Sequence, residues 1–214
     1  MNDNKSTTEF YNLNAQLLNN LTNPPPIEIS DIEKAIGQLK LNKSPDAVNL
    51  FSEHFLYSHP SIVTHLKSLF NLILNHSYVP QCFTHGIVIP IIKDKRGDAT
   101  ELSNYRPITI SSTISKFFEC FLFNSFLSFL TSDPLQFGYK LHTGCPNAIF
   151  LLRRVIQHFN NRSSSVYVAS IDASKAFDGV NHYKLFSILI KKGLPSYFVH
   201  TLHNWYSRLN VKIK

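Results

Sequence analysis

Glycine and cysteine are scarce in this sequence, and a long hydrophobic run is absent. Seven glycines against 17 phenylalanines in 214 residues exclude a linker-like or fibrous chain. The three cysteines are far apart and form no Cys-x-x-Cys pair, which excludes a disulfide framework and a zinc knuckle and favours a reducing compartment. The most apolar run, residues 117–130, is shorter than the about 20 residues of a membrane-spanning helix. No membrane partner is therefore expected.

The amino-terminal residues are polar and lack the apolar core of a signal peptide. We therefore expect an intracellular protein, cytoplasmic or nuclear, that is not secreted. The sequence has no internal repeat, so solenoids and propellers are excluded. His54, His59 and His65 lack the i, i+4 spacing that zinc enzymes place on one helix face, so the ten histidines indicate no zinc site.

Apolar residues make up 43% of the chain and aromatic residues 13%, which is enough to build a core for one or two domains. The formal net charge is +7. An anionic partner is compatible with that charge, but many proteins of similar charge bind no polyanion, so composition leaves both alternatives open.

Hydrophobic periodicity predicts a helix-rich chain with a few short strands. Residues 1–26 show no sustained period and end in three prolines, which indicates a variable or disordered segment. Residues 86–92 and 166–171 are β-branched and predict strands, although Pro90 restricts the first to an edge or a bulge. The expected helices are centred on residues 30–39, 62–73, 115–130, 148–159, 181–192 and 197–206. The helix at 148–159 should turn its apolar face inward, and residues 211–214 alternate as a strand does.

The most informative feature is Asp172, a carboxylate at the end of the predicted strand 166–171. A strand end is a rigid platform for a metal ligand, and Mg²⁺ accepts one carboxylate together with carbonyl and phosphate oxygens. Alternatively, Asp172 merely caps the following turn, which is the commoner role of an aspartate in such a position. Asp178 is expected to stabilise the next helix start, and Phe177 is more often a core residue than a functional one.

A second feature is a basic segment with Lys93, Lys95, Arg96 and Arg106. Lysine and arginine beside a hairpin-like loop could hold a triphosphate, because the guanidinium fork matches phosphate oxygens. The alternative is a solvated charged loop. Cations and a metal-binding carboxylate in one chain favour phosphoryl transfer, which needs positive charge on both sides of the phosphates.

Five motifs occur in an order that resembles the reverse transcriptases of non-LTR, LINE-like retrotransposons. They are Lys43-Ser44-Pro45-Asp46, Ile87-Val88-Ile89-Pro90-Ile91-Ile92-Lys93, Asn104-Tyr105-Arg106-Pro107-Ile108, Gln136-Phe137-Gly138-Tyr139 and Asp172-Ala173-Ser174-Lys175-Ala176-Phe177-Asp178. The resemblance implies a partial right-hand polymerase fold, α+β and helix-rich with a small, mostly antiparallel sheet. Residues 27–165 would form a fingers-like region and residues 166–214 the beginning of the palm. It further implies an RNA template, a DNA primer, deoxynucleoside triphosphates and Mg²⁺ or Mn²⁺.

The resemblance also assigns roles to individual residues. Asp172 matches the first catalytic metal ligand, with the Ala173 carbonyl beside it. Phe177 matches the bulky residue under the incoming sugar. The remaining matches are Lys93, Lys95 and Arg106 for the triphosphate, and Gln136, Phe137 and Gly138 for a segment near the templating strand.

Two departures from the family pattern are visible. The turn Lys43-Ser44-Pro45-Asp46 lacks the glycines usual in the family, and the family's Gln-Gly and Tyr-x-Asp-Asp segments are not found. Because the latter supplies the other catalytic carboxylates, we expect a fragment of a retrotransposon polyprotein that does not polymerise alone. The alternative is a catalytically dead remnant that binds nucleic acid.

Overall fold

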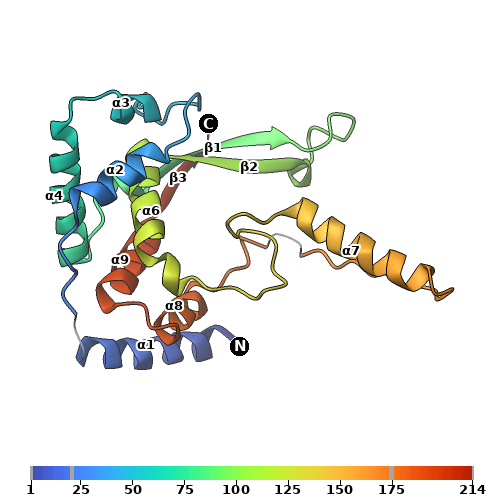
Figure 1. The fold of residues 1–214 in the computed structure, drawn as a ribbon. Coiled ribbons are helices and arrows are strands. Elements are labelled where there is room, and N and C mark those ends of the chain that lie inside the picture. Colours follow the sequence, from blue (N-terminus) through green and yellow to red (C-terminus); the bar gives the residue numbers. More distant parts are fainter. Residues whose placement is uncertain (1, 20–21, 174–175, 214) are drawn as a thin grey trace. The chain divides into compact units, whose positions relative to one another are not determined.

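The structure is a computed structural model that describes residues 2–19, 22–173 and 176–213 (Figure 1). The chain forms two compact units. Unit 1 comprises Met1–Phe129 together with Asn181–Lys214, and unit 2 comprises Leu130–Val180. The expected boundary between fingers and palm lies within unit 2, so the two units do not coincide with that division, which stays a prediction.

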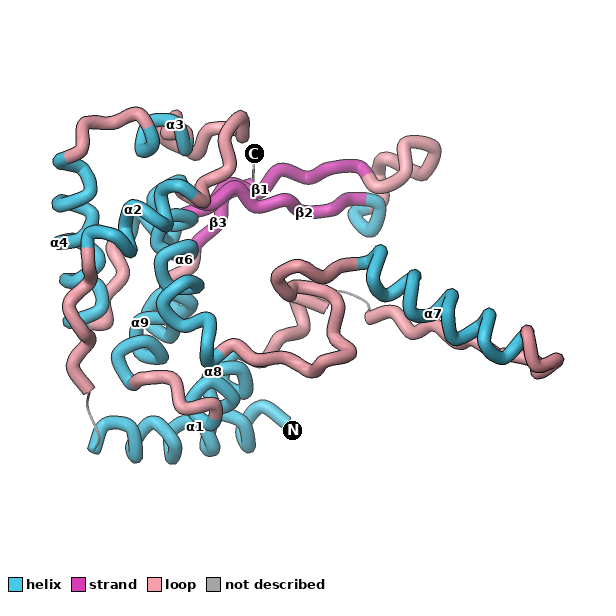
Figure 2. Tube along the Cα trace, viewed as in Figure 1, coloured by secondary structure: helices cyan, strands magenta, loops and turns pink. Residues whose placement is uncertain are grey.

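Unit 1 is helical with one small sheet, as Figure 2 shows by colour. Its α-helices are α1 (Asn2–Asn19), α2 (Ile29–Gly37), α3 (Ser52–Leu56), α4 (Ser61–His76), α5 (Gln81–Thr84), α6 (Thr113–Phe126), α8 (His182–Lys191) and α9 (Ser196–Ser207). Its strands are β1 (His85–Ile92), β2 (Tyr105–Ser111) and β3 (Asn210–Ile213), with short 3-10 turns at Leu102–Asn104 and Leu127–Phe129. In unit 2 the described residues contain one helix, α7 (Cys145–Asn160).

Aromatic side chains form the core of unit 1, where α2, α4, α6 and α9 pack together. The Phe70 ring of α4 lies 5.0 Å from the Phe117 ring and 4.7 Å from the Phe118 ring of α6. Trp205 of α9 lies against Phe118 at 5.6 Å. These residues recur at helical spacing along α4 and α6, so the sequence periodicity correctly predicts which faces are buried.

The sheet has the strand order β2-β1-β3 and is mixed. β1 and β2 form an antiparallel hairpin, whereas β1 and β3 are parallel, so the expectation of a mostly antiparallel sheet holds only for the longer pair. β3 pairs with residues 85–88 of β1 and no further, and β1 is therefore central in its first half. Pro90 lies beyond that pairing and opposite Pro107, which is how the strand accommodates it.

Residues 2–19 form helix α1, whereas the sequence predicts a variable or disordered segment over residues 1–26. Its anchor is Phe10, which is 1% exposed. The Phe10 ring stacks on His203 of α9 at 5.3 Å and lies 5.8 Å from Phe186 of α8. Asn14 Oδ1 lies 2.7 Å from His200 Nε2, and Glu9 forms an ion pair with Lys191. Packing of a few residues, rather than a long apolar stripe, accounts for this helix.

Unit 2 corrects two further expectations. The segment 166–171 is not a strand, because among the described residues no strand pairs with it, and Ile171 is 99% exposed. Helix α7 forms where the periodicity predicts it, but it has no buried residue, so its apolar face is not turned inward within the described chain. Periodicity shows which face of a helix is apolar but does not supply the element that covers it.

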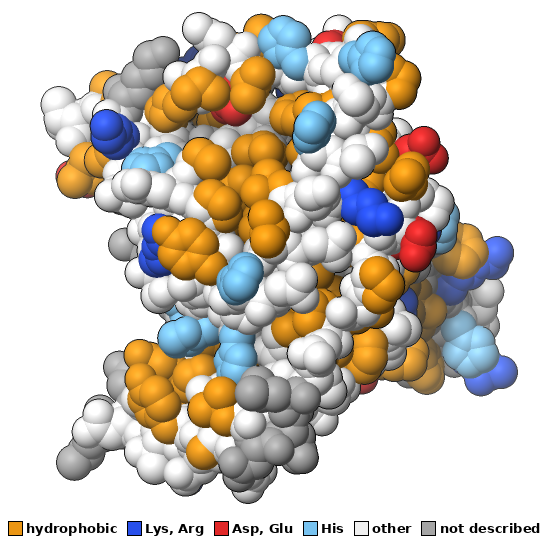
Figure 3. Space-filling model, turned by 90° about the vertical axis from the view of Figure 1, so that its left-hand side faces the viewer, with side chains coloured by type: hydrophobic (Ala, Val, Ile, Leu, Met, Phe, Trp, Pro, Cys, Tyr) orange, Lys and Arg blue, Asp and Glu red, His pale blue; other side chains and the backbone are white. Residues whose placement is uncertain are grey.

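The face of unit 1 that carries α4 has few charged side chains, and hydrophobic and histidine side chains gather there (Figure 3). Leu72 of α4 and the nearby Tyr78 are exposed on the surface of unit 1. Among the described residues, no helix is both long enough and apolar enough to cross a membrane.

Candidate functional site

The β1–β2 hairpin brings two of the predicted phosphate-binding residues together. Ile91 of β1 lies opposite Arg106 of β2, and the Lys93 N–H donates to the Asn104 carbonyl at 2.7 Å, which continues the same register by one more hydrogen-bonded pair. Side chains alternate between the faces of a strand, so Lys93 and Arg106 share a face. As diagonal neighbours they start from backbone positions about 7–8 Å apart. The structure thus places these two basic residues on one face of the hairpin.

Arg106 is the only charged side chain of β1 and β2. It is exposed, and the one ion pair among the described residues joins Lys191 to Glu9, so no carboxylate neutralises Arg106. A guanidinium in this state keeps all five N–H donors available to an anion.

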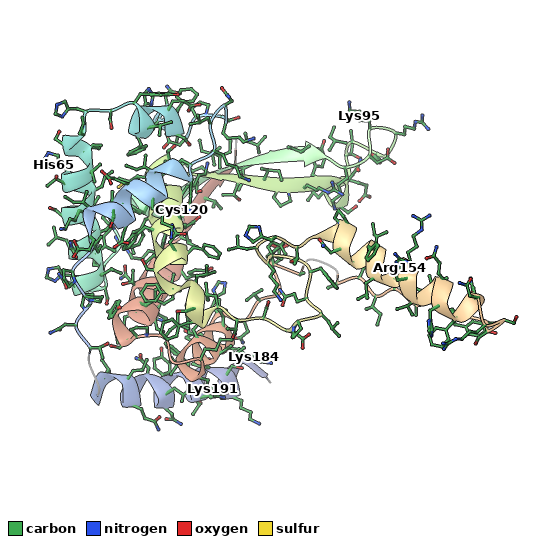
Figure 4. The ribbon with its side chains drawn as sticks, in the orientation of Figure 1. His65, Lys95, Cys120, Arg154, Lys184 and Lys191 are labelled. Atoms are coloured by element: carbon green, nitrogen blue, oxygen red, sulfur yellow. The ribbon has the colours of Figure 1, made fainter. Side chains whose placement is uncertain are left out.

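The loop between the strands contains as many acidic as basic residues, but the acids are used within the loop. Asp94 Oδ1 accepts from the Arg96 N–H at 2.9 Å, and Asp98 Oδ1 accepts from the N–H and the hydroxyl of Thr100, both at 2.7 Å. The two hydrogen bonds from Thr100 hold the pKa of Asp98 below its usual value. Lys95 is exposed in the same loop (Figure 4), and Lys93 Nζ donates to the Ser103 carbonyl at 2.6 Å. The carboxylates of Asp94 and Asp98 are therefore engaged in hydrogen bonds within the loop, while Lys95 is exposed to solvent.

The segment predicted to lie near the template forms a tight loop in unit 2. The Gln136 side-chain amide donates to the Gly138 carbonyl at 3.0 Å, and the Thr143 hydroxyl donates to the Phe137 carbonyl at 3.1 Å. Tyr139, which follows, has a φ of 56° and is thus in the left-handed region. The loop holds Gln136 and Gly138 exposed and leaves Phe137 half-buried.

Within unit 2, two motifs that are distant in sequence meet. The Tyr139 ring packs edge-on against the Phe177 ring, with a centroid distance of 6.2 Å. Phe177 is otherwise exposed and lies in a turn that the Val180 N–H closes by donating to the Phe177 carbonyl at 3.3 Å. Phe177 is therefore not a core residue in this structure, although an aromatic residue at such a position is more often buried in a core.

Asp172 and Ala173 lie in the extended part of unit 2 and are both exposed. Among the described residues, no group of three or more His, Cys, Asp or Glu side chains could hold a metal ion. Ser174 and Lys175 of the same motif lie outside the described residues. The next helix, α8, is capped by Asn181, whose Oδ1 accepts from the Lys184 N–H at 2.9 Å. The capping hydrogen bond therefore comes from Asn181, and the smaller dipole role of Asp178 stays a prediction.

The structure groups the predicted residues unit by unit. Lys93, Lys95 and Arg106 belong to one hairpin of unit 1, whereas Asp172, Ala173 and Phe177 belong to unit 2 with the Gln136–Gly138 loop. A single nucleotide site built from both units stays a prediction.

Two residues of the quoted motifs have structural roles that sequence reasoning missed. Asn104 and Tyr105 tie down the hairpin loop through their side chains. The signal for this was present, because asparagine beside a turn commonly hydrogen-bonds to the backbone.

Asp46 of the first motif is a third missed residue. Its side chain is buried at 6% exposure and accepts hydrogen bonds from the Val48 and Leu50 N–H groups at 3.0 and 2.9 Å and from the Thr113 N–H at 2.9 Å. Burial by itself would raise the pKa of Asp46, but these bonds outweigh it and hold the pKa below its usual value. The carboxylate therefore joins the turn after Pro45 to the start of α6.

A cavity of about 700 Å³ opens beside Asp46 at the base of the hairpin. Its walls are mainly aliphatic and include Ile87 and Ile110, with Lys212 among the lining residues. Ile87 pairs with both Ile110 and Lys212 across the sheet. Because the odd-numbered residues of β1 share a face, this cavity and Arg106 lie along the same face of the hairpin.

Comparison with known proteins gives one matching family, described as "Reverse transcriptase (RNA-dependent DNA polymerase)", over residues 92–214. The chain is 27% identical, over 94% of its length, to the "Probable RNA-directed DNA polymerase from transposon BS" of Drosophila melanogaster. It is 30% identical, over 48% of its length, to the "Retrovirus-related Pol polyprotein from type-2 retrotransposable element R2DM" of the same organism. The chain spans 23% of the first relative and 10% of the second.

Proposed function

The chain belongs to the reverse transcriptase family of RNA-dependent DNA polymerases, and on this premise we propose that it contributes the nucleotide-handling part of a retrotransposon polymerase. The reaction would be template-directed transfer of a deoxynucleotide to a primer 3′-hydroxyl. In this proposal residues 27–165 act as the fingers and residues 166–214 begin the palm.

The observation that carries the proposal is the shared face of Lys93 and Arg106 on the hairpin. A guanidinium without an acidic partner, diagonally across the hairpin from a lysine, gives the bidentate and the point-like contacts that a triphosphate accepts. Lys95, exposed on the loop that joins the two strands, adds a third basic side chain. We assign these three residues to the triphosphate of the incoming nucleotide.

Asp172 and the Ala173 carbonyl supply oxygen donors of the kind that Mg²⁺ or Mn²⁺ prefers, so their chemistry fits the divalent ion used by this family. When bound, such an ion would neutralise phosphate charge and orient the reacting oxygens. Asp172 is exposed, so its carboxylate can act as a ligand without rearrangement of a core.

Phe177 and the loop at Gln136, Phe137 and Gly138 complete the proposed nucleotide environment. The contact between Tyr139 and Phe177 supports a common site for the two motifs, with Phe177 under the sugar and the loop near the templating strand. An exposed aromatic ring held by one edge contact has a free face for a sugar or a base.

The proposed partners are an RNA template, a DNA primer and deoxynucleoside triphosphates. The isoleucine-lined face between the cavity and Arg106 supports this, because it carries cations at both ends and no acidic side chain on β1, β2 or β3. The names of the relatives include Pol polyproteins, so we propose that the chain acts as part of a larger protein inside the cell, in the cytoplasm or the nucleus.

The test is binding of dTTP to the 214-residue chain by titration calorimetry with Mg²⁺. Arg106→Ala should weaken binding by roughly tenfold or more, since hydrogen bonds to charged groups contribute about 1.5–3 kcal/mol. Lys93→Ala should weaken it less, and Lys34→Ala, a matched change on the exposed side of α2, should have no effect. Equal affinity of all variants would contradict the proposal. Salt-dependent RNA binding without dTTP binding would favour the nucleic-acid-binding remnant.

A further inference from the structure

The side chain of Asn104 organises the hairpin loop. Its Oδ1 accepts from the Asp94 N–H at 3.0 Å, and its Nδ2 donates to the Asp94 carbonyl at 3.0 Å and to the Asp98 carbonyl at 3.1 Å. The first two bonds reproduce, with a side-chain amide, the paired exchange that backbone groups make in an antiparallel ladder. One asparagine thus continues the ladder past the last strand pair and anchors the middle of the loop as well.

Other parts of the loop are built around this side chain. A Cβ atom at Gly97 would lie 3.0 Å from Asn104 Nδ2, so a larger residue at position 97 would have to push the Asn104 side chain aside by a few tenths of an ångström. The Asn104 N–H also donates to the Glu101 carbonyl at 3.0 Å, and the hydroxyl of the neighbouring Tyr105 donates to the Ala99 carbonyl at 2.9 Å. Both branches of the loop are therefore tied to the first two residues of the Asn-Tyr-Arg-Pro motif.

The anchor lies between the two cations assigned to the triphosphate. Lys93 immediately precedes Asp94, the residue that Asn104 holds, and Arg106 follows Asn104 by two positions. Loss of the Asn104 amide would free the backbone of Asp94 and Asp98, and the backbone of Lys93 would keep only the hydrogen bond from its own N–H to the Asn104 carbonyl. A loop ordered before the ligand arrives avoids the entropy cost of ordering on binding.

We propose that Asn104 is a positioning residue of the phosphate-binding hairpin, whose side chain fixes the backbone that follows Lys93 so that Lys93 and Arg106 contact one triphosphate. This inference rests on the proposed function, because it concerns the same site. It assigns to Asn104 no contact with the nucleotide itself.

The test uses Asn104→Ala in the 214-residue chain, with dTTP and Mg²⁺ as the probe. We expect affinity to fall about three- to tenfold, the range given by the ordering of one or two side chains on binding. Amide hydrogen exchange at Asp94 and Gly97 should accelerate, while the unfolding midpoint reported by Trp205 stays unchanged. Asn124→Ala is the matched control, because Asn124 is an asparagine of α6 that also makes a side-chain hydrogen bond.

A double variant separates positioning from general damage. In the Lys93→Ala background, Asn104→Ala should cost less than about twofold further affinity, because Asn104 acts through Lys93 and residues that act through one another are not additive. Equal losses in both backgrounds would overturn the inference.

Failure of this inference can be distinguished from failure of the proposed function. If dTTP binds and Arg106→Ala weakens it while Asn104→Ala does not, only the role of Asn104 is overturned. If the wild-type chain does not bind dTTP, the proposed function is overturned and this inference with it.

Discussion

Asp46 offers a sharp test of how the first motif stabilises unit 1. Replacement by alanine removes the acceptor of three backbone N–H groups, of which that of Thr113 is buried at the start of α6. A buried donor left without a partner costs about 1–3 kcal/mol, and the two less buried donors, on Val48 and Leu50, cost less. We therefore expect Asp46→Ala to lower the free energy of unfolding by about 3–4 kcal/mol.

The isosteric variant Asp46→Asn separates the contribution of the Thr113 hydrogen bond from that of the Val48 and Leu50 hydrogen bonds. Its remaining oxygen can still accept from the Val48 and Leu50 N–H groups, but its amide nitrogen faces the Thr113 N–H, and two donors cannot bond. We expect a loss of about 2 kcal/mol, roughly half that of the alanine variant. Asp98→Ala is the control, because this carboxylate also accepts a backbone N–H but is exposed, and its removal should leave the midpoint unchanged.

Urea unfolding followed by the fluorescence of Trp205 measures these changes. Trp205 is the only tryptophan, is buried in unit 1 and packs against Phe83 and Phe118, so its signal reports the unit that contains Asp46. A loss of less than about 1 kcal/mol in Asp46→Ala would refute the reasoning, because it would mean that the three donors find other partners or water.

Three further predictions concern α1, pH and activity. Phe10→Ala should abolish the amide-exchange protection of α1 and leave that of α4 intact, because Phe10 is the buried anchor of α1. Burial lowers the pKa of both His200 and His203, so the unfolded chain binds more protons below about pH 6.5. Stability should therefore fall as the pH drops from 7.5 to 5.5, and a flat urea midpoint over that range would contradict this. The 214-residue chain alone should give no template-dependent primer extension with Mg²⁺, because one carboxylate, Asp172, does not position two metal ions. Labelled extension products on a denaturing gel would refute this prediction.

The longer helices after α1 and the strand β1 of unit 1 could be predicted because their signals are local, whereas β2 is not among the predicted strands. The spacing of Leu66, Phe70 and Ile73 marks the buried face of α4, and the β-branched run before Lys93 marks β1. Gly193, with a φ of 80°, ends the segment after α8 where the sequence predicts it. The shared face of Lys93 and Arg106 follows from the strand register, which only the structure supplies.

The features that could not be predicted depend on distant partners. Helix α1 forms around Phe10 because α8 and α9 provide aromatic neighbours, and no periodicity in residues 1–26 indicates this. Residues 166–171 have the composition of a strand, but a strand exists only with a hydrogen-bonded neighbour. The role of Asp46 depends on its contact with Thr113, 67 residues away, which composition does not determine.

The facing prolines of the hairpin have a consequence for how the protein avoids unwanted association. Pro90 and Pro107 form a pair that exchanges no hydrogen bonds, because proline has no N–H. At such a pair of an antiparallel ladder the backbone nitrogens face outward, away from the partner strand. The outer edges of β1 and β2 therefore both lack a backbone N–H donor at this pair. A strand from another molecule would lose one hydrogen bond there, whichever edge it approached. The arm can stay long and isoleucine-rich without templating intermolecular β-structure.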